Sequence, residues 1–419
     1  MDPITLGQAK KHTDQKVLEQ QEALDVTTFG KKWLNQPYGN SNVVPKITTL
    51  IGCQDDETPD LVSCTASVDG EHWKINGRGW KVEIAGSVTA QFRMNPPAPL
   101  ETKPAQSLCA WVYIEDVSKV DVMSFQIYWT ADMQTPWNAS PTSLGYTLKN
   151  GWNFFRIQAK YSVPVAITNW NNVYRTRIAI QTSGATSVTI GHVFLEHFDK
   201  AKMVVVCDGC YSTFLSEVYP SLASRNIPVT WAVSPGKLGE VKYMTEEQLL
   251  DVAKENDNEL SFHSWNAEDL EIMTEAELRA ESIKCIKWAQ ERGYNPLWRA
   301  AWFRNNAPNH SATQGLWLAY SSPTEDTSVR TNCWPPMNRY NVGRRILHTQ
   351  TQASLAEMFA ELKLTNGFLN LYTHGLSESS NDISLDQLNW FLAEVDTALA
   401  EGWLLPTTVG SLLRQHAVL

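Results

Sequence analysis

The pattern of apolar residues changes near residue 199, and this change divides the chain into parts that must fold differently. Residues 203–209 run through three consecutive valines into Cys207-Asp208-Gly209. An apolar run without alternation is typical of a parallel strand that is buried on both faces. Strand and helix patterns alternate after this run, whereas only short strand patterns precede it closely. We therefore expect a mixed multidomain fold that ends in an α/β domain, residues 199–419.

The α/β domain is predicted to hold seven strands with helices between most of them. Capping boxes open two helices at Thr245 and Thr274, Gly293 ends the second of these helices, and Ser384 opens a last long helix. Repeated strand–helix units favour a distorted (β/α)7-type barrel. The expected strands are 203–207, 228–233, 258–262, 297–302, 316–320, 345–348 and 367–373.

Residues 61–198 show short β patterns separated by turn signals such as Asn76-Gly77 and Asn150-Gly151. This pattern predicts a carbohydrate-binding-like β-sandwich, built as a jelly roll. Most of its tryptophans are expected in the core, whereas Trp137 and Trp170 lie in polar loops and are candidates for stacking on sugar rings. The expected strands are 72–75, 80–84, 88–93, 107–114, 124–129, 152–158, 174–181 and 188–195.

The first 60 residues carry weaker signals. Residues 1–32 are polar, with a thin apolar stripe that predicts a marginal helix needing a partner, so we expect an attachment or oligomerisation segment. A frayed terminus is the alternative interpretation. Residues 33–60 hold Pro, Asn, Gly and Asp without periodicity and are predicted to be a linker.

Charge and composition exclude several classes of partner. A net charge of −10 argues against nucleic acid, whose phosphates require a basic face. No apolar run approaches the ~18 residues of a membrane helix, so no membrane partner is expected. The N-terminus lacks a basic stretch followed by an apolar one, so no secretory signal is expected. The seven cysteines are irregularly spaced and are expected to be mostly reduced.

Polar residues stand where four of the predicted strands end. They are Asp208, His263, Arg299 and His374. In a barrel these ends meet at one rim, so we expect the four side chains to share a site. An aspartate with a histidine suits Zn²⁺ or another divalent ion, and a second histidine suits a proton donor. Each residue also has a structural interpretation, such as capping a turn or pairing with a structural carboxylate.

These strand ends resemble the motifs of the polysaccharide deacetylase family, also called the NodB-homology or carbohydrate esterase family 4. The first motif, Thr-Phe-Asp-Asp-Gly, aligns with Val205–Gly209, and His263-Ser264 begins the second. Arg299 aligns with the third motif, and Leu371–His374 matches the Leu-x-x-His of the last. The resemblance covers about half of the chain, roughly residues 199–412. It implies a barrel that deacetylates glycans with a divalent metal, with His374 as the acid.

The departures from the family pattern fall on its chemistry. Cys207 stands where the family has its general base, and Ala267 stands where it has a second metal-binding histidine. Asp208 and His263 are then the only family ligands left, so we expect Zn²⁺ to be weakly bound or absent unless a neighbour from 266–269 replaces Ala267. Cys207 is a candidate base, ligand or nucleophile if its pKa is lowered. A rim that binds sugar without reacting is the alternative.

Aromatic residues near the same strand ends are expected to form the walls of a glycan site. These candidates for substrate binding are Trp265, Trp302, Trp334 and Tyr372.

A second resemblance concerns the N-terminal residues 6–14, which are similar to short N-terminal segments of phage tail fibres and tailspikes. This resemblance implies a homotrimer in the virion tail that contacts other tail proteins. Together, the two resemblances predict a tailspike that binds bacterial surface polysaccharide and modifies it as a deacetylase or degrades it as a depolymerase. The alternative is a non-catalytic carbohydrate-binding protein with a degenerate deacetylase domain.

Overall fold

The computed structural model divides the chain into two compact units, one of residues Val44–Asp199 and one that holds Lys200–Leu419. It describes residues 46–54, 57–74, 77–96, 98–101, 107–129, 131, 136–139, 148–158, 172–267, 270, 272–300, 316–317, 319–322, 342–377 and 382–416. The predicted N-terminal helical segment, residues 1–32, lies outside these ranges.

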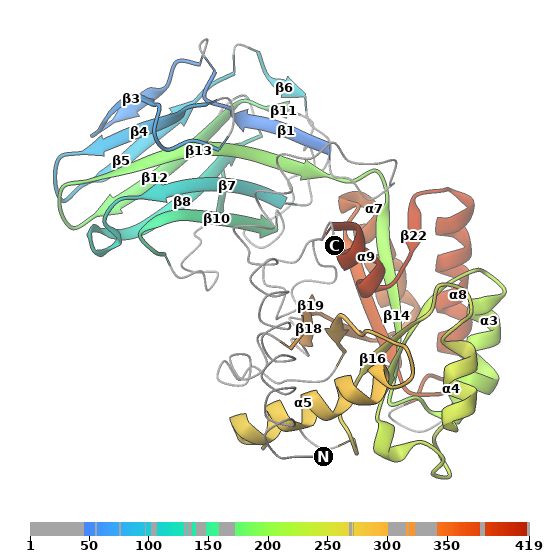
Figure 1. Cartoon of the computed structure of the whole chain (residues 1–419). Helices are drawn as coiled ribbons and strands as arrows, with labels where there is room; N and C mark the ends of the chain where they lie inside the picture. Colours follow the sequence, from blue (N-terminus) through green and yellow to red (C-terminus); the bar gives the residue numbers. More distant parts are fainter. Residues whose placement is uncertain are drawn as a thin grey trace, which may run out of the picture. The chain divides into compact units, whose positions relative to one another are not determined.

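The first unit contains two antiparallel sheets (Figure 1). One has six strands in the order β10-β7-β13-β4-β3, with β1 paired to β13: β1 (Lys46–Ile51), β3 (Thr65–Asp69), β4 (Gly79–Ile84), β7 (Ser107–Ile114), β10 (Gly151–Gln158) and β13 (Thr186–His197). The other has the order β2-β5-β12-β8-β9: β2 (Asp60–Val62), β5 (Thr89–Met94), β8 (Val120–Tyr128), β9 (Pro136–Ala139) and β12 (Arg175–Thr182). A small sheet pairs β6 (Leu100–Glu101) with β11 (Asn172–Val173), and a 3-10 turn, η1 (Val117–Lys119), precedes β8.

Alternating side chains from the two larger sheets enclose one apolar core, as a β-sandwich requires. Phe92, Phe125 and Ile178 come from the five-stranded sheet, and Val82 and Val112 come from the six-stranded sheet. Consecutive long strands from β4 to β13 alternate between the two sheets. Buried and partly exposed residues alternate along β12, and this alternation produces the strand pattern that the sequence shows there.

Two predictions for this unit need correction. Residues 72–74 are not a strand, because the Asp69 carboxylate accepts hydrogen bonds from the backbone N–H groups of Glu71 and His72 and turns the chain there. The predicted linker, residues 33–60, carries strand β1, which pairs with β13 and buries Ile51 in the core. The apolar residues of β1 do not alternate regularly, so periodicity missed it.

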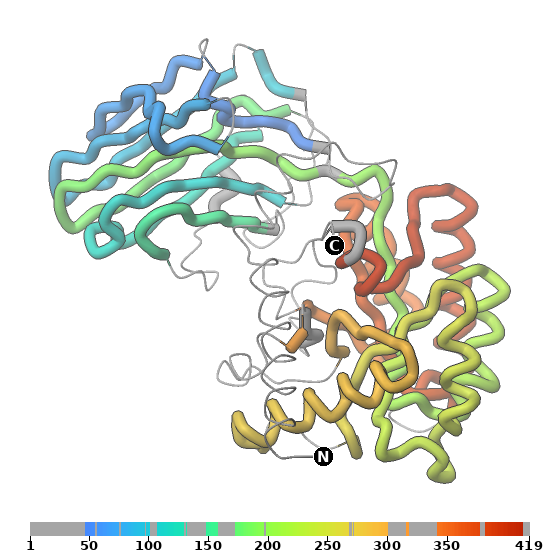
Figure 2. Tube along the Cα trace, viewed as in Figure 1, coloured from blue at the N-terminus to red at the C-terminus, as the bar shows by residue number. Residues whose placement is uncertain are grey.

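The second unit is built on parallel strands, which follow one another along the Cα trace in Figure 2. One sheet has the order β16-β15-β14-β21-β20, with β22 paired to the start of β14, and a second has the order β17-β18-β19. The strands are β14 (Ala201–Asp208), β15 (Val229–Val233), β16 (Glu259–Phe262), β17 (Trp298–Arg299), β18 (Ala319–Ser322), β19 (Val342–Gly343), β20 (Arg345–Ile346), β21 (Phe368–Thr373) and β22 (Leu404–Pro406).

Helices separate most of these strands and begin at predicted signals. Capping boxes are present at Thr245 and Thr274, as predicted, and also at Thr351 and at Ser384, which opens the predicted last helix. The helical elements are a π-helical turn η3 (Phe214–Val218), α3 (Tyr219–Ala223), a 3-10 turn η4 (Pro235–Lys237), α4 (Glu246–Val252), α5 (Glu275–Gln290), α7 (Gln352–Thr365), α8 (Leu385–Ala400) and α9 (Val409–His416). Among the described residues, no helix is long and apolar enough to cross a bilayer.

The two parallel sheets are joined in a barrel-like path. Only Arg344 separates β19 from β20, so one short stretch of chain pairs with β18 on one side and β21 on the other. Between β16 and β17, the Ser261 hydroxyl donates to the carbonyl of Trp298 and accepts from the N–H of Ala300. This hydroxyl bridges the two strands where no ladder of backbone hydrogen bonds is described. The path therefore brings the strand ends toward one rim.

Candidate functional site

Three predicted residues lie together where parallel strands end. Asp208 is the last residue of β14, His263 follows β16, and His374 follows β21. The N–H of His263 donates to the carbonyl of Val233 in the neighbouring β15, which fixes the height of the imidazole on the rim. The carboxyl ends of adjacent parallel strands meet at one edge of a sheet, and this explains the grouping.

The Asp208 carboxylate faces the His263 imidazole. Asp208 Oδ1 lies 4.0 Å from His263 Nε2, and the two side chains are 2% and 20% exposed. Within the described residues, Asp208 Oδ1 and His263 Nδ1 have no hydrogen-bond partner. A buried carboxylate oxygen without a partner is costly and marks a position where a ligand or a reacting group is expected.

Arg344 completes this cluster, and the sequence analysis missed it. Its Nη1 lies 3.0 Å from Asp208 Oδ2 and donates to the carbonyl of Ala300 at 3.0 Å. Its guanidinium carbon lies 3.9 Å from the centre of the Tyr372 ring. The Arg344 side chain is fully buried, because residue 344 is the joint between the two parallel sheets. Its position beside a predicted strand was the available signal, but the half-buried Arg345 gives the same signal.

Burial and neighbouring charges set the protonation states of Asp208 and His263. Burial alone would raise the pKa of Asp208, but the charge of Arg344, followed by those of His263 and His374, holds this pKa below its ordinary value. Burial lowers the pKa of His263, and the opposing effect of Asp208 does not cancel this shift, to which Arg344 and His374 add. Asp208 is therefore ionised and His263 is a neutral imidazole near pH 7.

A ring cluster surrounds His374. The centre of its imidazole lies 5.5 Å from the Tyr211 ring and 5.9 Å from the His348 ring, and Tyr211 stacks on Tyr243 at 4.9 Å. His348 was also missed, although it ends the predicted strand 345–348 and so carries the same signal as His263 and His374. Burial and the charge of His374 lower the pKa of His348, and Asp382 opposes this shift. The cluster gives the half-buried His374 one aromatic wall and one imidazole neighbour.

The turn after Asp208 is strained. Gly209 and Cys210 have φ angles of +85° and +55°, in the left-handed region. A Cβ at Gly209 would stand 2.8 Å from the Tyr211 ring, so glycine is required there. Such a conformation costs a non-glycine residue like Cys210 on the order of 1 kcal/mol, and strain of this kind is often found at functional sites. This left-handed conformation turns the backbone immediately after Asp208.

Arg299 has a different position from the one expected. Its Nε and Nη2 donate to the carbonyl of His263 at 3.1 and 2.9 Å, and its Nη2 lies 2.7 Å from Glu281 Oε2. Its Nη1 donates to the Ser282 hydroxyl. These contacts place Arg299 behind His263, where it holds the backbone of that residue. Arg299 therefore pairs with a structural carboxylate, that of Glu281, which is the structural interpretation given above for such a residue.

Cys207 also departs from expectation. Successive side chains of a strand point to opposite faces, so Cys207 and Asp208 cannot face the same way. Cys207 is fully buried in the core that the helices cover, and its thiol lies 4.0 Å from the carbonyl oxygen of His374. The interpretation of Cys207 as base, ligand or nucleophile is therefore corrected to that of a core residue.

The expected aromatic walls are only partly described. Trp265 is half-buried, with Lys284 Nζ 3.7 Å from the centre of its ring. Tyr372 is 3% exposed and lies against Arg344, so it supports the site from beneath and is not a wall. Trp302 and Trp334 lie outside the described residues, and Trp170 does too.

The described residues do not fit a tightly held metal. No group of three histidine, cysteine, aspartate or glutamate side chains gathers to hold one among them. Ala267 is exposed, with a φ of +59°, and Glu268 and Asp269 lie outside the described ranges. Asp208 also has a guanidinium 3.0 Å away, and a second cation beside it would be repelled. The described side chains therefore suit chemistry by a carboxylate and imidazoles more than chemistry on a metal ion.

A cavity of about 300 Å³ lies at the opposite ends of the strands. Its lining includes Glu259, the first residue of β16, and Tyr294 and Pro296, which precede β17. Because β16 begins there, the cavity is separated from the rim by the length of the strands.

Comparisons with known proteins give distant likenesses only. No family model matches the chain, and no curated protein matches it. The Xyl-CE4 domain of a multidomain xylanase from the hindgut metagenome of Trinervitermes trinervoides is 12% identical to this chain. The match covers 52% of this chain and 91% of that chain, with a TM-score of 0.34.

Two further solved structures are similar over shorter stretches. The glycoside hydrolase domain of Endo-D from Streptococcus pneumoniae R6 has 13% identity, covers 35% of this chain and has a TM-score of 0.26. A carbohydrate-binding module of the β-sandwich superfamily has 16% identity, covers 36% and has a TM-score of 0.27. The chain spans 23% of the first protein and 61% of the second. These values are too low to assign a function.

Proposed function

We propose that this protein binds a bacterial surface polysaccharide at the strand ends of its C-terminal unit and removes acetyl groups from it. The observation that carries the proposal is the pair formed by Asp208 and His263. An ionised carboxylate 4.0 Å from a neutral imidazole, each with an unsatisfied atom, is an arrangement suited to general base catalysis. A polysaccharide deacetylase-like barrel is the fold class that this site fits.

In the proposed reaction, His263 takes a proton from a water molecule that attacks the acetyl carbonyl carbon. Asp208 stabilises the imidazolium that forms, as a carboxylate does beside a catalytic histidine. His374 gives a proton to the sugar oxygen or nitrogen as the bond to the acetyl carbon breaks. The products are acetate and a free hydroxyl or amino group on the sugar.

Arg344 and Arg299 support this reaction from beneath. Arg344 keeps Asp208 ionised, because a guanidinium 3.0 Å from a buried carboxylate favours its charged form. Arg299 is a positioning residue, since it donates two hydrogen bonds to the carbonyl of His263 and is itself held by Glu281.

The test is incubation of the full chain with purified capsules from a panel of bacteria, followed by assays for acetate, reducing ends and unsaturated sugars. We expect acetate release, and we expect Asp208→Asn and His374→Gln to lower it by roughly 100-fold. Asp251→Asn and His72→Gln, on a helix surface and in the sandwich, are the matched controls and should keep full activity.

Other outcomes would revise the reaction. Reducing ends or unsaturated sugars in place of acetate would identify a depolymerase acting as a hydrolase or a lyase. Activity that chelation abolishes and zinc restores would contradict the metal-free site.

Binding without catalysis is the second candidate, and one observation favours it. The Asp208 side chain is only 2% exposed and already paired with Arg344, as a structural ion pair would be. Tight binding of one capsule, with no product from any member of the panel, would establish this alternative.

The context we propose is a phage tailspike that acts in the virion tail, outside the host cell. The similarity of residues 6–14 to tail-fibre segments supports it. A trimer would give the marginal helix predicted for residues 1–32 the partners that it needs. Light scattering of the full chain should give three times the mass of one chain, and a monomer at micromolar concentration would contradict this arrangement.

A further inference from the structure

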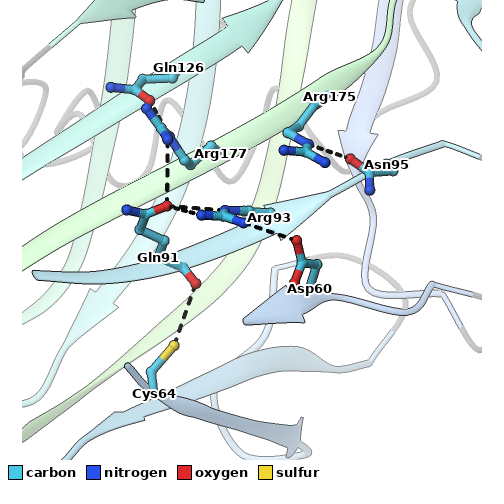
Figure 3. A network of polar contacts seen from close by, with 8 residues as sticks. All are labelled: Asp60, Cys64, Gln91, Arg93, Asn95, Gln126, Arg175 and Arg177. Carbon is cyan, nitrogen blue, oxygen red and sulfur yellow. Dashed lines mark hydrogen bonds and ion pairs between the residues drawn. The ribbon is translucent and has the colours of Figure 1, made fainter. Parts of the chain in front are cut away.

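Three arginines lie on the solvent-facing side of the five-stranded sheet of the sandwich (Figure 3). Arg93 belongs to β5, and Arg175 and Arg177 belong to β12. Their neighbours in the strands, such as Phe92 and Ile178, point into the core. Because side chains alternate along a strand, all three guanidinium groups emerge on one face. We call this group the arginine face.

The arginine face concentrates like charges. Arg93 and Arg177 are directly opposite in the antiparallel register of β5 and β12. Like charges in opposite positions destabilise a sheet. Burial and the charges of Arg93 and Arg175 lower the pKa of Arg177, and Tyr128 opposes this shift. The arrangement therefore reduces the stability of the sandwich.

Neutral groups hold the guanidinium groups in place. The side-chain oxygen of Gln91 accepts from Arg93 Nη2 at 2.6 Å and from Arg177 Nη1 at 3.4 Å. Gln126 accepts from Arg177, and Asn95 accepts from Arg175 Nε at 2.7 Å. Amide acceptors orient the arginines without cancelling their charge. This differs from a structural ion-pair network, in which carboxylates would take these positions.

Among the described residues, acidic side chains neutralise little of the positive charge of the arginine face. Within the described residues, the one carboxylate paired with the arginine face is Asp60, 3.2 Å from Arg93 Nη1 and 49% exposed. Arg175 and Arg177 have no carboxylate partner there. The whole chain has a net charge of −10, so a concentration of positive charge on one sheet face is a local feature.

We propose that the arginine face binds the carboxylates of an acidic polysaccharide, such as a glycan rich in uronic acids. The planar fork of a guanidinium matches a carboxylate in two hydrogen bonds, and its charge complements the ligand. The partly exposed amides of Gln91 and Gln126 lie beside the guanidinium groups and add the hydrogen-bonding groups that sugars require. Nucleic acid is disfavoured because the rest of the chain is acidic.

This site is additional to the proposed deacetylase site and lies in the other unit of the chain. The two proposals share a ligand class, so the experiment separates them by using the full chain with Asp208→Asn, which lacks turnover if the proposed function holds. In that background, the part of the binding that replacement of the arginines removes reports on the arginine face. Deacetylation without polyuronate binding would overturn only this further inference.

The test is affinity electrophoresis of the full chain in gels that contain polygalacturonate, with dextran as the neutral comparison. We expect retardation by polygalacturonate and none by dextran. The double variant Arg175→Gln/Arg177→Gln should weaken the affinity by roughly tenfold or more, since each charged hydrogen bond contributes substantially. Raised salt should weaken it too.

The matched control is Lys81→Gln/Lys119→Gln, which removes the same charge from the sandwich away from the arginine face and should keep the affinity. The unfolding temperature separates binding from structure, because removing repelling charges should leave it unchanged or raise it. A double variant that binds as tightly as the parent would overturn the proposal. Equal retardation by single-stranded DNA would also overturn it, since the face would then be a general polyanion site.

Discussion

At the residue scale, the site depends on how one buried carboxylate is compensated. Burial removes water from the Asp208 carboxylate, and the 3.0 Å contact with Arg344 compensates part of the free energy that this costs. The second carboxylate oxygen is left without a hydrogen bond among the described residues and faces His263. The two oxygens of the Asp208 carboxylate therefore differ in their contacts: Oδ2 pairs with Arg344, and Oδ1 faces the imidazole of His263.

Replacement of Arg344 tests this balance. Arg344→Gln should lower the free energy of unfolding by about 3–5 kcal/mol, because it leaves a buried carboxylate unpaired. Chemical denaturation of the parent and the variant measures the loss. Asp208→Asn/Arg344→Gln should recover much of it, since the charge that needed a partner has been removed. A loss below about 1 kcal/mol in the single variant would show that Asp208 does not depend on Arg344.

At the element scale, the alternation of side chains along strand β14 places residues both in the core and at the site. Met203, Val205 and Cys207 point to the helix-covered core, and Val204 and Val206 point to a second apolar cluster on the other face of the sheet. Asp208 continues the second series and stands at the carboxyl end of the strand. Every residue of the strand is buried, which is why its sequence lacks polar alternation.

The same alternation makes a prediction for Cys207. Cys207→Ala should leave turnover unchanged, because the thiol faces the core and not Asp208. It should lower the free energy of unfolding by about 1–2 kcal/mol through lost apolar packing. Acetate release and thermal unfolding measure the two effects. Loss of activity in a variant that remains folded would restore Cys207 to the chemistry.

At the scale of the whole molecule, the two units have separate cores, and a buried histidine makes the stability of the sandwich depend on pH. The core of the sandwich includes β13, whose His192 is 1% exposed, with Nε2 3.2 Å from the Thr49 hydroxyl. Burial lowers the pKa of His192 from 6.5 to about 4. The unfolded chain therefore binds a proton that the folded sandwich does not, and stability falls as the pH drops from 6.5 toward 4.

Calorimetry at pH 7 and pH 5 measures this effect. His192 should remove about 2 kcal/mol of sandwich stability at pH 5, given an unfolded pKa near 6.5. Two separate units are expected to give two transitions, and His192→Asn should reduce the pH dependence of only one of them. Equal pH dependence in the variant and the parent would place the acid sensitivity elsewhere.

The sequence by itself determined the local features of this protein. The boundaries of α4, α5 and α8 follow from capping boxes, and the strand ends at Asp208, His263 and His374 follow from apolar runs that stop at polar residues. These features depend on neighbours within a few residues, which a sequence displays directly.

Only the tertiary structure decided which side chains meet. Arg344 could not be distinguished from Arg345, and Arg299 could not be assigned to Glu281, because burial and partner choice arise from packing between distant segments. The arginine face likewise exists only because β5 and β12 pair in one register. Long-range contacts are set by the free energy of the whole fold, and no local pattern encodes them.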